Sequence, residues 1–425
     1  SSAGFSFLIQ LIAALFLAGM LAWQVKRKNA PPKNLPAIIT RFVLPALLLV
    51  CVVLLAIVAY SSQPGLHAER MLVILKEQAD VSMAKKIEDY PTRRITVYQN
   101  LTIHAQESQA NIRGFLEKWR IVYTPYYLLN AIETIDNPIL RWYLQSRPEV
   151  DRILDSPHMR PLPQNETKPL FQFNENPPDE IPWNLSMIHV DRVWEELGVY
   201  GDGIIIGQSD SGVQGDHPDL ADQYRGAGNQ HDYNWFDPWN HSLAPVDTGG
   251  HGTHTLGTIL GKRTGVAPQA QWIGCVNLAR NLGNPALYLD CMQFMFAPFP
   301  QGGDPFTQGE PSLGAHVLNN SWGCPEFEGC DAEVFLPAVK ALQAAGVFVA
   351  AGAGNDGPAC STVSSPLPLY AEVFAVGAVD SQGSLASFSS LGPVTVDGSQ
   401  RPKPDLVAPG VQVLSTLPGS TYGAF

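Results

Sequence analysis

Two acid–base side chains follow small-residue turns in the C-terminal half of the chain. Asp210 comes just after the apolar run at 203–207 in GIIIGQSDSGV, and His251 follows two glycines in DTGGHGTHTLGTILG. A carboxylate that fixes a histidine's tautomer, and a histidine that acts as general base, are two of the three groups of Ser-His-Asp catalysis. Taken alone, each has a simpler explanation: an aspartate after a strand often caps a turn, and a histidine in a glycine loop is often structural.

Four short apolar runs predict the scaffold that would position these side chains. They are GIIIG at 203–207, HVLNNSW at 316–322, VFVAAGAG at 347–354 and VFAVGAV at 373–379. Strands that are apolar on both faces and separated by helices indicate an α/β fold, a parallel sheet with helices on both faces. Active sites in such folds lie at the carboxyl ends of the strands.

In this order, the segments resemble the subtilisin family (subtilases), whose triad runs Asp, His, Ser along the chain. SDSGV followed by HPDL, and GHGTHTLGT, are similar to the family's first two signatures, which implies that Asp210 and His251 are catalytic. AAGAGNDGP implies that Asn355 donates to the oxyanion, although an asparagine before Asp-Gly is also a common turn residue. NNSWG at 319–323 resembles the segment that pairs with substrate beside the S1 pocket. The implied substrate-binding residues are Ser321, Trp322, Gly323, Ala353 and Gly354.

No residue of this sequence is assigned as the serine nucleophile that the resemblance implies. In the family it lies in a GTSMA-type motif, and the sequence ends at Phe425 about four residues before that serine is expected. Late serines such as Ser415 and Ser420 lack the preceding Gly-Thr. We therefore expect the chain as given to be catalytically inactive. Details such as YNWFD, EGC and GPACSTV look most like the bacterial extracellular subtilases related to bacillopeptidase F.

Residues 70–156 predict a small α+β domain, because β-type runs such as MLVIL alternate with helix-type runs such as NPILRWYLQSR. With VILKEQADVS near its start and PEVDRIL near its end, it resembles the inhibitor-type propeptide of subtilases, which implies a folding chaperone and intramolecular inhibitor. Residues 157–184 are rich in Pro, Asn and charge, which indicates a linker with a processing site. The protease domain would then cover 185–425.

Two apolar runs without charge, 5–23 and 42–60, each have the length that crosses a bilayer core of about 30 Å. They predict two transmembrane helices within residues 1–62. The loop between them is basic and is expected in the cytoplasm, which places the rest of the chain outside; its cations are Lys26, Arg27, Lys28, Lys33 and Arg41. A cleaved signal peptide, made of this loop and the second run, is the alternative.

Six cysteines are present, and Cys51 lies inside the second apolar run, so one of the remaining five must stay unpaired. Cys324 and Cys330 flank a short loop that a disulfide could close in an oxidising compartment. The alternative is a set of small unpaired hydrophobic residues, and a metal site is disfavoured because no CxxC spacing occurs.

No cofactor or metal site is assigned. Calcium often stabilises the subtilase family, and Asp219 in HPDL matches one ligand position. However, the chain between the expected His251 helix and GVAP is too short for the usual calcium loop. Zinc is disfavoured because His251 and His254 lack the glutamate of an HExxH motif.

The sequence therefore predicts a membrane-anchored serine endopeptidase precursor that acts on protein or peptide substrates. Its own propeptide would be its inhibitor, and processing would release the extracytoplasmic protease domain. A net charge of -12 gives no broad basic surface, so nucleic acid is not an expected partner. The alternative function is a membrane-anchored pseudoprotease or peptide-binding module; the joint presence of Asp210, His251 and Asn355 argues against it.

Overall fold

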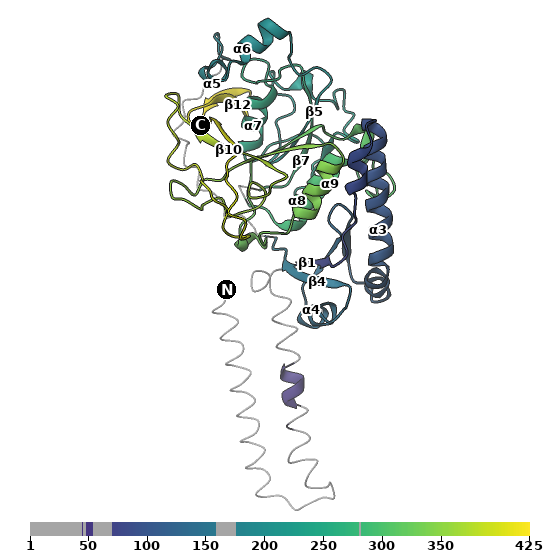
Figure 1. Ribbon diagram of the computed structural model, residues 1–425. Coiled ribbons are helices and arrows are strands. Elements are labelled where there is room, and N and C mark those ends of the chain that lie inside the picture. The colour runs from purple at the N-terminus through teal and green to yellow at the C-terminus, as the bar shows by residue number, and fades with distance from the viewer. Residues whose placement is uncertain (1–44, 46–47, 54–69, 159–175, 280–281) are drawn as a thin grey trace, which may run out of the picture. The chain divides into compact units, whose positions relative to one another are not determined.

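The computed structural model describes residue 45 and residues 48–53, 70–158, 176–279 and 282–425 (Figure 1). The chain divides into two compact units, residues 1–69 with 136–142 and residues 70–135 with 143–425. The predicted apolar spans 5–23 and 42–60 lie almost wholly outside the described residues. Within the described part, no helix combines the length and apolar character that crossing a bilayer requires.

A seven-stranded sheet forms the scaffold of residues 183–425, here called the large domain. Each pair of neighbouring strands is parallel, which confirms the predicted α/β class. In spatial order the strands are β11 (Leu406–Pro409), β10 (Phe374–Val379), β9 (Phe348–Gly352), β8 (Val317–Asn320), β5 (Ile205–Asp210), β7 (Gln271–Val276) and β6 (Trp235–Phe236). A hairpin of β12 (Leu414–Leu417) and β13 (Thr421–Ala424) follows.

Helices cover both faces of this sheet. Successive side chains of a strand point to opposite faces, and in β7 Trp272 packs in one core cluster with Leu256, whereas Ile273 packs in another with Leu289. Leu256 lies on α7 (His251–Leu260) and Leu289 on α8 (Pro285–Phe296). The other helices and helical turns are α5 (Trp183–Met187), α6 (Val190–Arg192), η3 (Val193–Leu197), η4 (Ala221–Gln223), η5 (Pro311–Leu313), η6 (Glu326–Glu328) and α9 (Leu336–Ala344).

Residues 70–158, here called the small domain, contain a four-stranded antiparallel sheet of order β2-β3-β1-β4. Its elements are β1 (Arg70–Leu75), η2 (Ser82–Lys86), α3 (Tyr90–Lys118), β2 (Tyr123–Tyr126), β3 (Ala131–Ile135), α4 (Pro138–Gln145) and β4 (Val150–Asp155). The long helix α3 begins where Asp89 caps it, because Asp89 Oδ2 accepts from the backbone N–H of Thr92 at 2.9 Å.

Two disulfides brace the large domain. Cys275–Cys291 ties β7 to α8, and Cys324–Cys330 closes the loop after β8. The second pairing was one of the alternatives that the sequence left open, whereas nothing in the sequence pointed to the first. Cys360 is free and exposed, and is the unpaired cysteine that the odd number required.

Candidate active site

Asp210 and His251 meet at the carboxyl end of β5. Asp210 is the last residue of that strand and is fully buried, and His251 is the first residue of α7. Nδ1 of His251 lies 2.7 Å from Oδ1 of Asp210. Because a carboxylate only accepts, Nδ1 carries the proton and donates it, which leaves the lone pair of the ring on Nε2. This arrangement suits a histidine that acts as general base through Nε2.

Gly252 permits the close approach of α7 to β5. A Cβ atom at this position would lie 2.1 Å from the carbonyl oxygen of Gly212 and 3.0 Å from Cβ of Asp210. A larger residue would therefore push the start of α7, and His251 with it, away from the carboxylate. This requirement explains why a glycine follows the histidine directly.

Asp247 holds the start of α7 and was not singled out from the sequence. Its Oδ1 accepts from the backbone N–H groups of Gly249 and Gly250 at 2.9 and 2.7 Å, and from Ser211 Oγ at 2.9 Å. Its Oδ2 accepts from N and Oγ1 of Thr253 at 2.9 and 2.6 Å. One carboxylate thus fixes both the turn before α7 and the residue after β5. An aspartate ahead of a predicted helix start is a capping signal that could have found it.

The electrostatics of the pair raise the pKa of His251. The side chain of His251 is 41% exposed, whereas that of Asp210 is 0% exposed. Burial acts to lower the pKa of His251, but the charge and hydrogen bond of Asp210, with a contribution from Asp247, outweigh it, so the pKa of His251 is raised. Among the described residues none hydrogen-bonds Nε2, which leaves this atom open to a nucleophile.

His254 lies one helical turn further along α7 and has a structural role. It is buried, and its Nε2 lies 3.1 Å from the carbonyl oxygen of Val413 and 3.2 Å from that of Gly423. Burial lowers its pKa to about 4. Two carbonyl groups engage Nε2 of this buried histidine, so the atom that would act as base in His251 is occupied in His254.

The predicted substrate-binding segments leave the sheet at the same edge as this pair. In the strand register, Gln208 of β5 lies opposite Asn319 of β8, which lies opposite Ala350 of β9. Residues 321–323 follow β8 directly, and residues 353–355 follow β9 directly. Both segments therefore begin level with the end of β5, at the edge where parallel α/β sheets form their sites.

The core below the sheet fixes the segment after β8. The ring of Trp322 is only 7% exposed and stacks on Tyr288 with 4.0 Å between ring centroids, while its Nε1 donates to Ser209 Oγ at 3.2 Å. The hydroxyl of Tyr288 lies 3.2 Å from the carbonyl oxygen of Gly323. The indole is thus a core group, and any pairing of this segment with a substrate would use its backbone.

The remaining predicted residues differ in exposure. Ser321 Oγ accepts from Asn319 Nδ2 at 3.0 Å, Ala353 is buried, and Gly354 has φ +110°, a value that favours glycine. Asn355 is exposed, and its side chain forms no hydrogen bond with any described residue. Its amide is therefore free to donate to a ligand.

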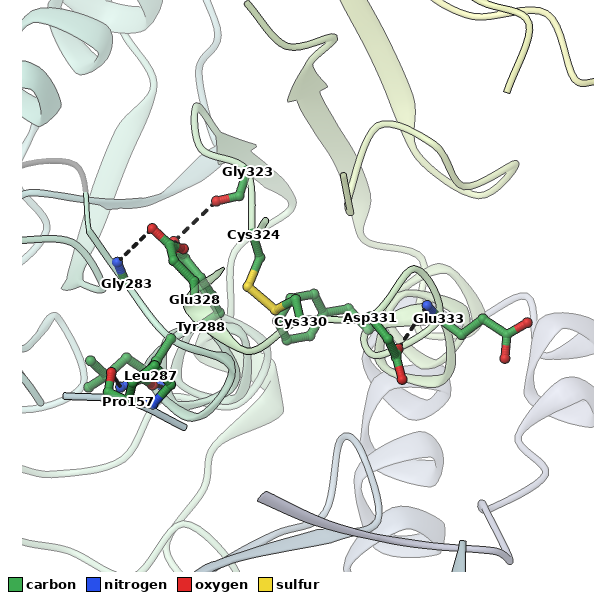
Figure 2. The surroundings of a disulfide bond; sticks show 12 residues. Pro157, Gly283, Leu287, Tyr288, Gly323, Cys324, Glu328, Cys330, Asp331 and Glu333 are labelled. Atoms are coloured by element: carbon green, nitrogen blue, oxygen red, sulfur yellow. Dashed lines mark hydrogen bonds between the residues drawn. A yellow bond between two sulfur atoms is a disulfide. The ribbon is translucent and has the colours of Figure 1, made fainter. Parts of the chain in front are cut away.

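A disulfide loop follows residues 321–323 (Figure 2). The Cys324–Cys330 bridge closes it, and Glu328 within it is buried. Oε1 of Glu328 accepts from the backbone N–H of Gly283 at 3.2 Å, and Oε2 lies 2.7 Å from the hydroxyl of Tyr288. Burial raises the pKa of Glu328. The loop is therefore attached to the segment that precedes α8.

Asp219, the residue matched to a calcium ligand, is buried, and its backbone N–H donates to Nδ1 of His217 at 3.1 Å. One of its carboxylate oxygens has no hydrogen-bond partner. Within the ranges that the structure describes, no group of three His, Cys, Asp or Glu residues could hold a metal ion.

Comparison with known proteins places the chain in a family. Residues 201–424 match the subtilase family of peptidases. The chain is 31% identical to bacillopeptidase F of Bacillus subtilis (strain 168) over 364 residues, which are 78% of this chain and 24% of that protein. It is 32% identical to subtilisin BL of Lederbergia lenta over 249 residues, which are 57% of this chain and 77% of that protein. The chain thus spans about a quarter of bacillopeptidase F but most of subtilisin BL. On this match and the geometry above, the chain belongs to the subtilase family.

Proposed function

We propose that this chain is the precursor of a serine endopeptidase that hydrolyses peptide bonds with an Asp-His-Ser triad. Asp210 would orient His251, and the serine would come from the segment that the family pattern places after Phe425. The observation that carries the proposal is the 2.7 Å contact between His251 Nδ1 and Asp210 Oδ1, beside an Nε2 that no described residue engages. Membership of the subtilase family supports serine-type peptidase activity.

In the proposed reaction, the serine Oγ bonds to the scissile carbonyl carbon while His251 Nε2 takes the hydroxyl proton. The carbonyl oxygen becomes an oxyanion, to which the side-chain amide of Asn355 donates. Cleavage of the C–N bond follows, and His251 returns its proton to the leaving amine. Water, deprotonated by His251, then hydrolyses the acyl-enzyme and regenerates the serine.

We also propose that the small domain is the inhibitory propeptide. Its last strand continues into residues 156–158, where the carbonyl oxygen of Pro157 accepts from Asn284 Nδ2 at 3.2 Å. A Cβ atom at Gly329, in the disulfide loop, would lie 2.0 Å from the carbonyl oxygen of Asp155. The tail thus passes along the Cys324–Cys330 loop, which follows residues 321–323, and along the start of α8. This position supports inhibition until the linker 157–184 is cut.

Contacts away from the tail support the same assignment. Oε1 of Gln293, on α8, accepts from the backbone N–H groups of Tyr127 and Leu128 at 2.7 and 3.1 Å. Arg152 of β4 forms an ion pair with Asp331 of the large domain at 2.6 Å. The small domain therefore uses both backbone and charge to dock on the large domain.

We further propose an extracytoplasmic location with release after processing. The two disulfides of the large domain support an oxidising compartment. Anchoring by residues 5–23 and 42–60 stays a prediction from the sequence. Carbonate extraction of membranes that contain the full-length protein tests it: membrane-spanning segments keep the small domain in the pellet, whereas a cleaved signal peptide leaves the small domain in the supernatant.

The function is tested on the full-length protein by casein hydrolysis, with and without a serine-directed phosphonate. We expect hydrolysis that the phosphonate abolishes and that His251→Ala also abolishes. His241→Asn, a change at an exposed histidine, should leave hydrolysis unchanged. If the processed protein hydrolyses nothing but still binds peptides, the pseudoprotease alternative replaces this proposal.

A further inference from the structure

Arg94 of the small domain is buried against the large domain. Its side chain lies on α3 and the residue is 1% exposed. Nε donates to the carbonyl oxygen of Pro311, Nη1 to that of Ala315 and Nη2 to that of Phe296, each at 2.8 Å. We call these three carbonyl groups, all on the large domain, the carbonyl socket. The fourth partner, the hydroxyl of Tyr90 at 2.7 Å from Nη1, lies on the same helix as Arg94.

The socket holds a cation without a carboxylate. Within the described part of the chain, Arg94 forms no ion pair, and the rings of Tyr90 and Phe296 lie 5.4 and 5.7 Å from its guanidinium carbon. A buried charge is costly unless hydrogen bonds satisfy it. The planar guanidinium presents several N–H donors in fixed directions, which an ammonium group cannot reproduce. Shape and directed hydrogen bonds, rather than charge pairing, therefore select the occupant.

The walls of the socket fit this group closely. A Cβ atom at Gly314 would lie 2.1 Å from Nη2 of Arg94 and 2.1 Å from the carbonyl oxygen of Phe296.

Arg93, the residue before Arg94 in α3, also contacts the large domain. It donates from Nη2 to the carbonyl oxygen of Gln343 at 2.9 Å and from Nε to that of Ala344. These are the last carbonyl groups of α9, where a cation is favoured. The first half of α3 is thus a docking element in its own right (Figure 1).

We propose that the carbonyl socket is a further docking site for the propeptide, specific for a guanidinium group, which keeps the small domain bound after the linker has been cut. This inference rests on the proposed function, because a cut precursor is where such a site matters. The socket contacts the first half of α3, whereas the inhibitory tail follows β4. A tail that has been cleaved can therefore leave the Cys324–Cys330 loop while Arg94 still holds the domain.

The test uses the full-length protein in a His251→Ala background, with a site for a sequence-specific protease placed in residues 163–170. After cutting, the release of the small domain is followed by size-exclusion chromatography, and hydrogen exchange is followed over residues 90–101. Loss of hydrogen bonds to a charged group predicts about 100-fold faster release for Arg94→Ala. Lys118→Ala removes an exposed cation from the end of the same helix and should match the parent. If Arg94→Ala fails to fold, Arg94→Lys, which keeps the charge, must still release faster.

Chemical rescue makes the test specific. Millimolar guanidinium chloride should slow release from the Arg94→Ala variant and restore protection over residues 90–101, because the ion refills the socket. Urea, which is similar in shape but neutral, should not. Equal release by Arg94→Ala and the parent, or equal rescue by urea, overturns the inference. Neither readout needs hydrolysis, so a failed socket is distinguishable from a failed protease.

Discussion

The proposed catalytic pair, Asp210 and His251, and the carbonyl socket both bury a charged side chain, and they satisfy it in opposite ways. Asp210 accepts from the imidazole of His251 at 2.7 Å, and Nε2 of that imidazole has no partner among the described residues. Arg94 meets three fixed carbonyl groups and one hydroxyl, and its charge cannot be lost near neutral pH. A side chain that transfers protons needs a nitrogen without a hydrogen-bond partner. A side chain that only binds another domain needs all of its donors hydrogen-bonded.

The largest expected effect comes from removing the hydrogen bond between Asp210 and His251. Asp210→Asn keeps the shape but removes the acceptor that holds the proton on Nδ1, so the wrong tautomer of His251 is favoured. We expect kcat of the processed full-length enzyme to fall about 10⁴-fold, as for the equivalent change in other triads. Hydrolysis of a chromogenic peptide measures it. Wild-type kcat in this variant would show that the 2.7 Å contact has no catalytic role.

The second largest effect is expected at Asn355, because its amide is exposed and makes no hydrogen bond to the described residues. Asn355→Leu removes an oxyanion donor while it keeps the approximate size, so kcat should fall about 10²- to 10³-fold. KM should change little, because the donor acts on charge that develops in the transition state. Asp356→Asn, at the neighbouring exposed residue, is the control. A rise in KM with unchanged kcat would assign Asn355 to substrate binding instead.

Each of the two disulfides lies near a different region, one near the contact with the small domain and the other near the predicted substrate segment. Cys275–Cys291 closes a span of 16 residues and fixes α8, the helix that contacts the small domain, whereas Cys324–Cys330 closes a span of 6 beside the substrate segment. Loop entropy predicts losses of about 3 and about 2 kcal/mol in unfolding free energy when each pair is changed to alanine. The first double variant should also weaken retention of the cut small domain, and the second should raise KM. Denaturant unfolding measures the free energies, and kinetics measure release and KM. A higher KM in the first variant, or weaker retention in the second, would contradict this prediction.

The sequence was sufficient where a motif is local and insufficient where contacts are distant. Asp210 and His251 lie in glycine-rich signatures that must form tight turns, and the structure brings them together. The apolar runs at 203–207 and 347–354 became strands of the same parallel sheet, with β8 between them, because runs buried on both faces have few other solutions. Asn355 was placed only by resemblance, and the structure shows that it is exposed.

Arg94 could not have been found from the sequence. It lies in a helical stretch with alternating polar residues, and its partners come from residues 296–315, more than 200 positions away. Backbone carbonyl groups leave no mark in the sequence, since every residue has one. The same reason hid the Cys275–Cys291 pair, whose partners become adjacent only when β7 and α8 pack.

The smallest expected effect tunes the pair without breaking it. His251 must be neutral to accept a proton, and its pKa is raised, so kcat/KM should rise with pH through a value above the ordinary 6.5 or so. Asp247→Asn removes a negative charge that contributes to this shift, so the acidic limb should move to lower pH. The loss of one charged acceptor should also reduce the plateau about tenfold. Asp222→Asn, at an exposed carboxylate, should change neither. A pH profile of chromogenic peptide hydrolysis decides, because a purely structural role for Asp247 would lower the plateau and leave the limb in place.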